Sequence, residues 1–86
     1  MSADLVLIEW VDSAQPISQW QYLSDYRYLK PVKCVSVGFL IHDGKKVKGL
    51  APNMGDVDRS KTIQASGTIH IPTCCIKKIT KLEEVK

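Results

Sequence analysis

Apolar and polar residues alternate along most of this 86-residue chain, and the alternation predicts a series of short β-strands. The clearest stretch is residues 32–50, where β-branched and aromatic residues recur at every second position around the sequence His-Asp-Gly-Lys. This period is typical of a strand that buries one of its faces. We expect the bulkier alternate set of the first strand to form the buried face, namely Val35, Val37, Phe39 and Ile41.

The turn of this hairpin is expected at Asp43-Gly44, because both residue types tolerate the positive φ angles of a tight hairpin. The return strand alternates again, which places Val47 inward and its lysines outward. Pro52 has no N–H to donate to a strand ladder, so we expect the return strand to end near Ala51.

Three further segments have the composition of strands or of the turns between them. Residues 5–11 are apolar on both faces, which predicts a central strand or one at a subunit contact. Residues 63–71 alternate around Gly67, which marks a bend or a bulge. The sequence Pro-Thr-Cys-Cys at 72–75 predicts one tight turn, and residues 76–82 predict a last strand with a basic outer edge.

The two long connections differ in character. The segment 12–30 contains one tryptophan and all three tyrosines, and Ser18 is a candidate N-cap for a short helical turn that extends to about Tyr26. Its rings, with Trp20 and Leu23 among them, either dock on the mouth of a barrel as a lid or are presented to a partner or a nucleobase. Residues 53–62 are polar and of mixed charge, which predicts an exposed, mobile loop.

The order of these parts resembles that of the small five-stranded barrels of the Src-homology-3 and Sm-like type. The resemblance is carried by the strand Gly67–Pro72, the one-turn stop after it and a closing strand from Ile76. It implies a mainly β fold in which residues 1–86 form one five-stranded barrel domain with one short helix in the first long loop. A fold of this type does not by itself indicate an activity.

A second resemblance is carried by segments spread over most of the chain, namely Glu9–Ser13, Trp20, Cys34–Gly38, Leu40–Ile41, Leu50–Pro52 and Gly67–Pro72. With these segments the chain resembles a group of short, uncharacterised bacteriophage proteins. This resemblance implies a phage origin, expression in the cytosol of a bacterial host and a non-enzymatic role. Small phage proteins of this size often counter host defences.

Composition narrows the class of protein further. The formal net charge of +3 permits an anionic partner without requiring one. Three cysteines with no CxxC pair indicate reduced thiols in a cytosol rather than a disulfide framework. No apolar run reaches the length of about 18 residues that a membrane span needs. The N-terminus lacks the basic region and apolar core of a signal peptide.

No catalytic or metal-binding motif stands out, so we expect neither an enzyme nor a bound cofactor. No serine or cysteine has a histidine and an acid at a recognisable motif spacing. Asp56, Asp58 and Ser60 have the spacing of an acidic metal loop but lack its glycine and its final glutamate. A zinc site that includes adjacent Cys74 and Cys75 is disfavoured, because neighbouring cysteines rarely both reach one ion.

These observations favour a binding function. We expect a homo-oligomeric, non-enzymatic protein that counters a host defence, either by sequestering a small anionic, nucleotide-like ligand or by masking a host protein. The alternative is a nucleic-acid-binding accessory protein. In a ligand site, tryptophan stacks on a base, cations hold phosphate and asparagine donates hydrogen bonds. The candidate ligand-binding residues are Trp20, Lys46, Lys48, Asn53, Arg59 and Lys61.

Overall fold

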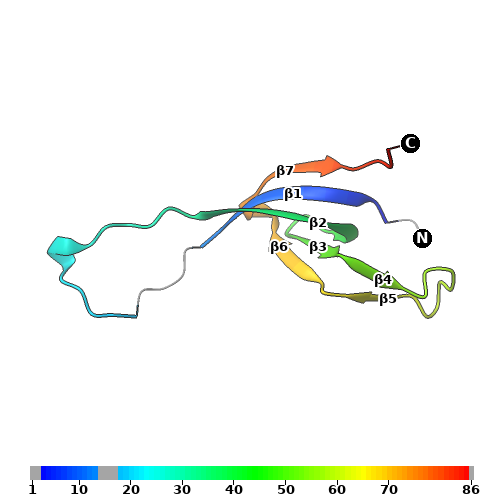
Figure 1. The fold of residues 1–86 in the computed structure, drawn as a ribbon, viewed down its shortest axis with the longest axis horizontal. Helices are drawn as coiled ribbons and strands as arrows, with labels where there is room; N and C mark the ends of the chain where they lie inside the picture. The colour runs from blue at the N-terminus through cyan, green and yellow to red at the C-terminus, as the bar shows by residue number, and fades with distance from the viewer. Residues whose placement is uncertain (1–2, 14–17, 86) are drawn as a thin grey trace.

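The computed structural model describes residues 3–13 and 18–85, and its regular elements are β-strands and two single 3₁₀ turns (Figure 1). The first strand, the hairpin, the one-turn stop and the last strand lie where the sequence predicts them. In chain order the elements are β1 (Leu5–Asp12), η1 (Leu23–Asp25), β2 (Val32–Asp43), β3 (Val47–Ala51), β4 (Asn53–Gly55), β5 (Gln64–Ser66), β6 (Ile69–Pro72), η2 (Thr73–Cys75) and β7 (Ile76–Lys81).

Five strands form the main sheet in the order β6-β3-β2-β1-β7, and every pairing between them is antiparallel. The longest ladder joins β1 to β2, from Leu5 opposite Phe39 to Asp12 opposite Val32. The expected mainly β, five-stranded fold is therefore confirmed. The predicted closure into a barrel is not, because β6 and β7 are the edges of an open sheet and do not pair with each other within the described residues.

β4 and β5 form a separate two-stranded sheet that extends beyond the main sheet (Figure 1). The sequence predicted a loop over 53–62 and a strand over 63–71 with a bend or a bulge at Gly67. The bend is confirmed, but β4 lies within the predicted loop, and the predicted strand is divided into β5 and β6. Gly67 has a φ of 73°, and a Cβ at this position would lie 3.0 Å from Cγ of Pro52. A left-handed bend at Gly67 therefore separates β5 from β6, and the loop of the distal hairpin begins only after β4.

The β2–β3 hairpin forms as predicted, but its turn does not. Neither Asp43 nor Gly44 has a positive φ. The N–H of Gly44 instead donates to the carbonyl of Val47 at 3.1 Å, and Asp43 lies opposite Lys48. The two residues between this bonded pair, Lys45 and Lys46, therefore form the turn, and neither has a positive φ. The side chain of Lys48 is largely buried against the Asp43 carboxylate, rather than outward as predicted.

The core cluster of Val6, Ile8, Leu50 and Ile71 lies on one face of the main sheet and is small. Ala51 is also buried, but it lies opposite Phe39 and therefore on the other face. Half-buried Trp10, Leu40 and Ile76 pack around its centre. Gly38 allows β2 and the end of β3 to approach closely, since a Cβ there would lie 3.0 Å from the carbonyl oxygen of Ala51. Within the described residues, the fully buried apolar side chains are Val6, Ile8, Leu50, Ala51 and Ile71.

The buried face of β2 is the opposite of the one predicted. Residues opposite each other in an antiparallel pair share a face, so buried Ile8 places its partner Ser36 on the core side. Val35 and Val37 lie on the other side and keep 63% and 48% of their surface exposed. Ile41, beyond a shift in register with β3, is also exposed. The more apolar alternate set of β2 thus points away from the core.

The described chain is elongated, with extents of 59 × 27 × 26 Å and a radius of gyration of 17.4 Å. A compact domain of this length has a radius of gyration of about 12 Å. The excess comes from two projections at opposite ends of the main sheet (Figure 1). One is the segment 18–31, which precedes β2, and the other is the β4–β5 hairpin.

Candidate binding surface

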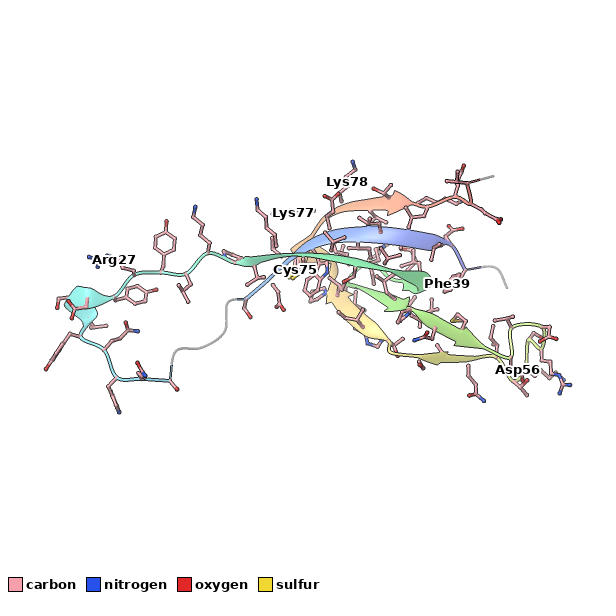
Figure 2. All side chains as sticks on the ribbon, viewed as in Figure 1. Arg27, Phe39, Asp56, Cys75, Lys77 and Lys78 are labelled. Atoms are coloured by element: carbon pink, nitrogen blue, oxygen red, sulfur yellow. The ribbon has the colours of Figure 1, made fainter. Side chains whose placement is uncertain are left out.

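Residues 18–31, which we call the aromatic arm, lie between β1 and β2 in the chain and project away from the main sheet (Figure 2). Every residue of the arm is exposed. Its one regular element is η1, which is closed by backbone hydrogen bonds of 2.9 and 3.1 Å. The large exposed side chains of the arm are Trp20, Tyr22, Leu23, Tyr26, Tyr28 and Leu29, with exposed fractions from 54% to 103%.

The predicted lid over the sheet is wrong. Trp20 is exposed to 103% and Leu23 to 89%, so neither side chain packs on the core. The helical turn predicted from Ser18 is reduced to η1, whose first residue has no side-chain cap. A single 3₁₀ turn has too few hydrogen bonds and no apolar stripe to hold it against the sheet. The other interpretation, in which the rings are presented to a partner, stays a prediction.

A second exposed apolar surface covers β1 and β2 on the side away from the core. Residues opposite each other in the two strands share this side, and only one of the six that define it is charged. Three of the apolar side chains keep between 37% and 63% of their surface exposed. We define this outer face by Leu5, Leu7, Glu9, Val35, Val37 and Phe39.

A cavity of about 460 Å³ lies where β1 ends and β2 begins. It forms at a shift in the β1–β7 register between Glu9 and Trp10, which leaves Lys77 without a direct partner in β1. Lys77 lies at the end of the sheet from which the arm projects (Figure 2). The cavity is therefore lined mainly by apolar atoms, with two lysines and one glutamate among its residues. Its lining is Glu9, Trp10, Val11, Lys33, Cys34, Val35 and Lys77.

The fold of a single copy does not bring the six candidate ligand residues together. Trp20 belongs to the arm, whereas Arg59 and Lys61 belong to the distal loop between β4 and β5. Figure 2 labels Arg27 of the arm and Asp56 of the distal loop at opposite ends of the molecule. The guanidinium of Arg59 lies 3.9 Å from the Asp56 carboxylate.

The other three candidates lie along the hairpins. The ammonium group of Lys48 is already paired with Asp43. Lys46 is exposed at the β2–β3 turn, where its carbonyl accepts a 2.9 Å hydrogen bond from the N–H of Thr73. Asn53 is exposed at the start of β4. Stacking and phosphate binding by these residues would therefore need a ligand that reaches across the molecule.

A groove of about 690 Å³ lies between the end of β2 and the distal loop. Asp58 is the one charged residue in its lining, and Arg59 and Lys61 do not take part in it. The groove is therefore unsuited to an anionic ligand. Its lining is Ala3, Leu40, Ile41, Val57, Asp58, Ser60 and Ile63.

The described thiols and acids do not gather around one point, since no three His, Cys, Asp or Glu side chains among them come together to hold a metal ion. Partial desolvation raises the pKa of the Cys75 thiol above its ordinary value, and the neighbouring Cys74 adds to the rise. A thiol with a raised pKa stays protonated at neutral pH and is a poor nucleophile. Cys34 and Cys74 are also free thiols.

No protein-family model, curated protein or solved structure matches this chain. The phage resemblance therefore stays an expectation from the sequence. In the part of the chain that the structure covers, no helix is long and apolar enough to cross a membrane.

Sequence patterning named Trp20 as a candidate ligand residue and considered the tyrosines of the same segment only as rings that dock on the barrel or meet a partner. It did not predict the cavity with Lys33 and Lys77 in its lining. The signal that the sequence did contain was the concentration of one tryptophan and all three tyrosines in a segment with no sustained strand or helix pattern. The cavity depends on a register shift, for which the sequence contains no such signal.

Proposed function

We propose that this chain is a non-enzymatic binding protein that masks another protein, and that the aromatic arm is the part that binds. The single observation that carries this proposal is the full exposure of the arm with its tryptophan and three tyrosines. Tryptophan and tyrosine are enriched among the residues that dominate binding energy in protein interfaces. They supply large contact area at low conformational cost.

The arm is large enough to support a specific interface. A buried aromatic side chain covers roughly 150–250 Å², so its four rings would bury on the order of 600–1,000 Å². A stable interface takes about 800 Å² from each partner. The arm therefore reaches the standard size without a contribution from the main sheet.

Charge favours a protein over a nucleic acid as the partner. Affinity for nucleic acid comes mainly from cations that neutralise several phosphates. The arm has Arg27 and Lys30 as cations, with Asp25 between its aromatic residues as an opposing charge. This density of positive charge is low for a phosphate backbone.

A second candidate function is the sequestration of a small anionic ligand. The observation in its favour is the cavity where Lys33 and Lys77 stand on apolar walls. Its volume of about 460 Å³ falls in the range of small-molecule sites. The ligand would then bind at the base of the arm and not through Lys46, Lys48, Arg59 or Lys61.

The resemblance to short bacteriophage proteins suggests the class of partner. In the cytosol of a bacterial host, the partner would be a host protein, and a defence protein is the member of that class we propose. The strand order and the single turn before β7 likewise support a relationship to the Src-homology-3 and Sm-like barrels, which we propose on that order alone.

The test compares wild type with the variant Trp20→Ser/Tyr22→Ser/Tyr28→Ser. Immobilised protein is incubated with bacterial lysate, retained proteins are identified, and binding is then measured with the purified partner. We expect one protein to be retained by wild type and lost from the arm variant. The matched control is Val85→Ser, which removes an apolar side chain that is 95% exposed outside the arm, and it should behave as wild type.

Three outcomes contradict the proposal. Retention of the same partner by the arm variant would show that the arm does not bind it. Tight binding of a single-stranded oligonucleotide that weakens by about 10³-fold between 50 and 200 mM salt would favour the nucleic-acid alternative. Binding of a mononucleotide that is lost in Lys33→Ala but kept in the arm variant would favour sequestration.

A further inference from the structure

The fold leaves the outer face of β1 and β2 uncovered, and the aromatic arm projects beyond the end of the sheet rather than across it (Figure 1). We infer that a second copy of this chain packs against the outer face, so that the protein is a two-fold symmetric dimer from which both arms project. This surface is separate from the arm, and the inference goes beyond the proposed function.

The first support is the pattern of apolar residues. β1 is apolar on both faces, and strands of that kind are usually covered on both sides. In β2 the side turned to the core has Ser36 and Gly38, whereas the side turned to solvent has Val35 and Val37. The chain alone thus leaves the more apolar side of β2 in water. A second copy removes this mismatch.

The second support is the size of the core. Only five apolar residues are fully buried in the described part of an 86-residue chain. A domain this short has little stability to spare, so an apolar cover for the outer face would stabilise the folded chain. A second copy is present wherever the chain is present, and its binding stabilises the fold more as the concentration rises. This favours self-association over a different occupant.

The area of the face sets the strength of the contact. The paired residues of β1 and β2 extend over eight pairs, or about 27 Å, and two strands make the face about 10 Å wide. β7 does not widen its apolar part, because the β7 residues opposite Leu7 and Glu9 are Thr80 and Lys78. The resulting patch of roughly 270 Å² per copy is smaller than a standard interface and has the size of a weak, transient contact. We therefore expect a dimer that dissociates reversibly on dilution.

The third support is the charge pattern. Glu9 lies opposite Lys78 of β7, and Lys33 lies two residue pairs further along the β1–β2 ladder, opposite Val11. Within the described residues Glu9 forms no ion pair. In a two-fold dimer every contact occurs twice, so the acid of each copy can face a lysine of the other. The surface is thus complementary to itself.

The test measures molecular mass by sedimentation velocity over a wide range of concentrations of the full chain. Wild type should pass from monomer to dimer with a dissociation constant in the micromolar range. Val37→Glu introduces a charge into the centre of the face and should raise this constant at least about tenfold. The matched control is Val57→Glu in the distal loop, because Val57 and Val37 are both 48% exposed. It should dimerise as wild type does.

A wild type that stays monomeric at the highest concentration, or a Val37→Glu variant that dimerises as tightly as wild type, would overturn the inference. If circular dichroism shows that Val37→Glu does not fold, Val35→Lys replaces it, since Val35 is 63% exposed and its side chain lies outside the core. Trp20→Ser should dimerise normally, and loss of its dimer would assign self-association to the arm instead. Binding of the proposed protein partner can be measured independently of dimerisation, because Val37→Glu leaves the arm unchanged.

Discussion

The indole N–H of Trp10 donates a hydrogen bond to the hydroxyl oxygen of Ser36 at 3.0 Å. The two residues are diagonal neighbours in the ladder, because Ser36 pairs directly with Ile8. This bond joins β1 to β2 on the core side of the main sheet. It also helps to explain why the small, polar side of β2 faces the core. The partly buried indole N–H of Trp10 needs a hydrogen-bond acceptor on that side, and Ser36 provides it.

Replacing Ser36 with alanine should destabilise the fold. The variant leaves the partly buried indole N–H without its acceptor, at a cost of about 1–2 kcal/mol in the free energy of unfolding. Urea unfolding followed by circular dichroism measures the change. Ser60→Ala removes an exposed hydroxyl and serves as the control. Equal midpoints for the two variants would mean that the bond contributes nothing.

Alanine substitutions at two strand glycines should differ sharply. A Cβ at Gly38 would lie 3.0 Å from the carbonyl oxygen of Ala51, whereas a Cβ at Gly55 meets nothing within 4 Å. Gly38→Ala should therefore lower the free energy of unfolding by about 1–3 kcal/mol through overpacking. Gly55→Ala should leave it unchanged or slightly higher. Thermal melts of both variants test the pair, and similar losses would contradict the close approach of β2 and β3.

Thr73 offers a stabilising substitution. Its hydroxyl oxygen is buried and has no hydrogen-bond partner within the described residues. Thr73→Val keeps the shape of the side chain and removes the unsatisfied group, so the free energy of unfolding should rise by about 1 kcal/mol. Urea unfolding of this variant provides the measurement. A loss of stability would show that the hydroxyl does have a partner in solution.

The two tryptophans should contribute very differently to stability. Trp20 is exposed to 103%, so Trp20→Ser should change the free energy of unfolding by no more than about 0.5 kcal/mol. Trp10→Ala removes a ring that packs on the core and should cost about 3 kcal/mol or more. Unfolding monitored by circular dichroism compares them directly. A large loss from Trp20→Ser would mean that the arm docks on the sheet after all.

The adjacent cysteines should react at different rates with iodoacetamide. Desolvation and the Cys74 neighbour raise the pKa of Cys75, so its thiolate fraction at neutral pH falls below that of an ordinary cysteine. Exposed Cys74 should be alkylated first. The rate at Cys75 should increase as the pH rises toward its raised pKa. Tandem mass spectrometry distinguishes the two positions, and faster modification of Cys75 would contradict the assignment.

Most strand positions could be predicted from the sequence, because β-branched residues, prolines and turn residues act locally. Pro52 ends β3 at Ala51, and the turn at 73–75 precedes β7, as expected. Which face of each strand packs against the core could not be predicted in the same way. Alternation shows that a strand has two unlike faces, but the face that packs against the core depends on residues far away in the sequence. In β2 the face with Gly38 packs against the core, because a side chain at Gly38 would be too close to the backbone of Ala51.

The candidate site was less predictable than the fold. Trp20 was expected to act beside Arg59 and Lys61, and the chain places them in separate projections. Residue chemistry identifies groups that can stack or hold phosphate, but their meeting depends on how the connections leave the sheet. The segment 18–31 leaves it entirely, so its aromatic residues share no surface with the distal loop.

The open sheet has a consequence for solubility. β7 leaves one row of backbone donors and acceptors without a neighbouring strand, and rows of this kind recruit strands from other molecules into fibrils. Lys77, Lys78 and Lys81 stand along that row, where their mutual repulsion opposes such growth. Acetylation of these three amines should remove this barrier, so that the modified protein aggregates in concentrated solution more readily than the unmodified one.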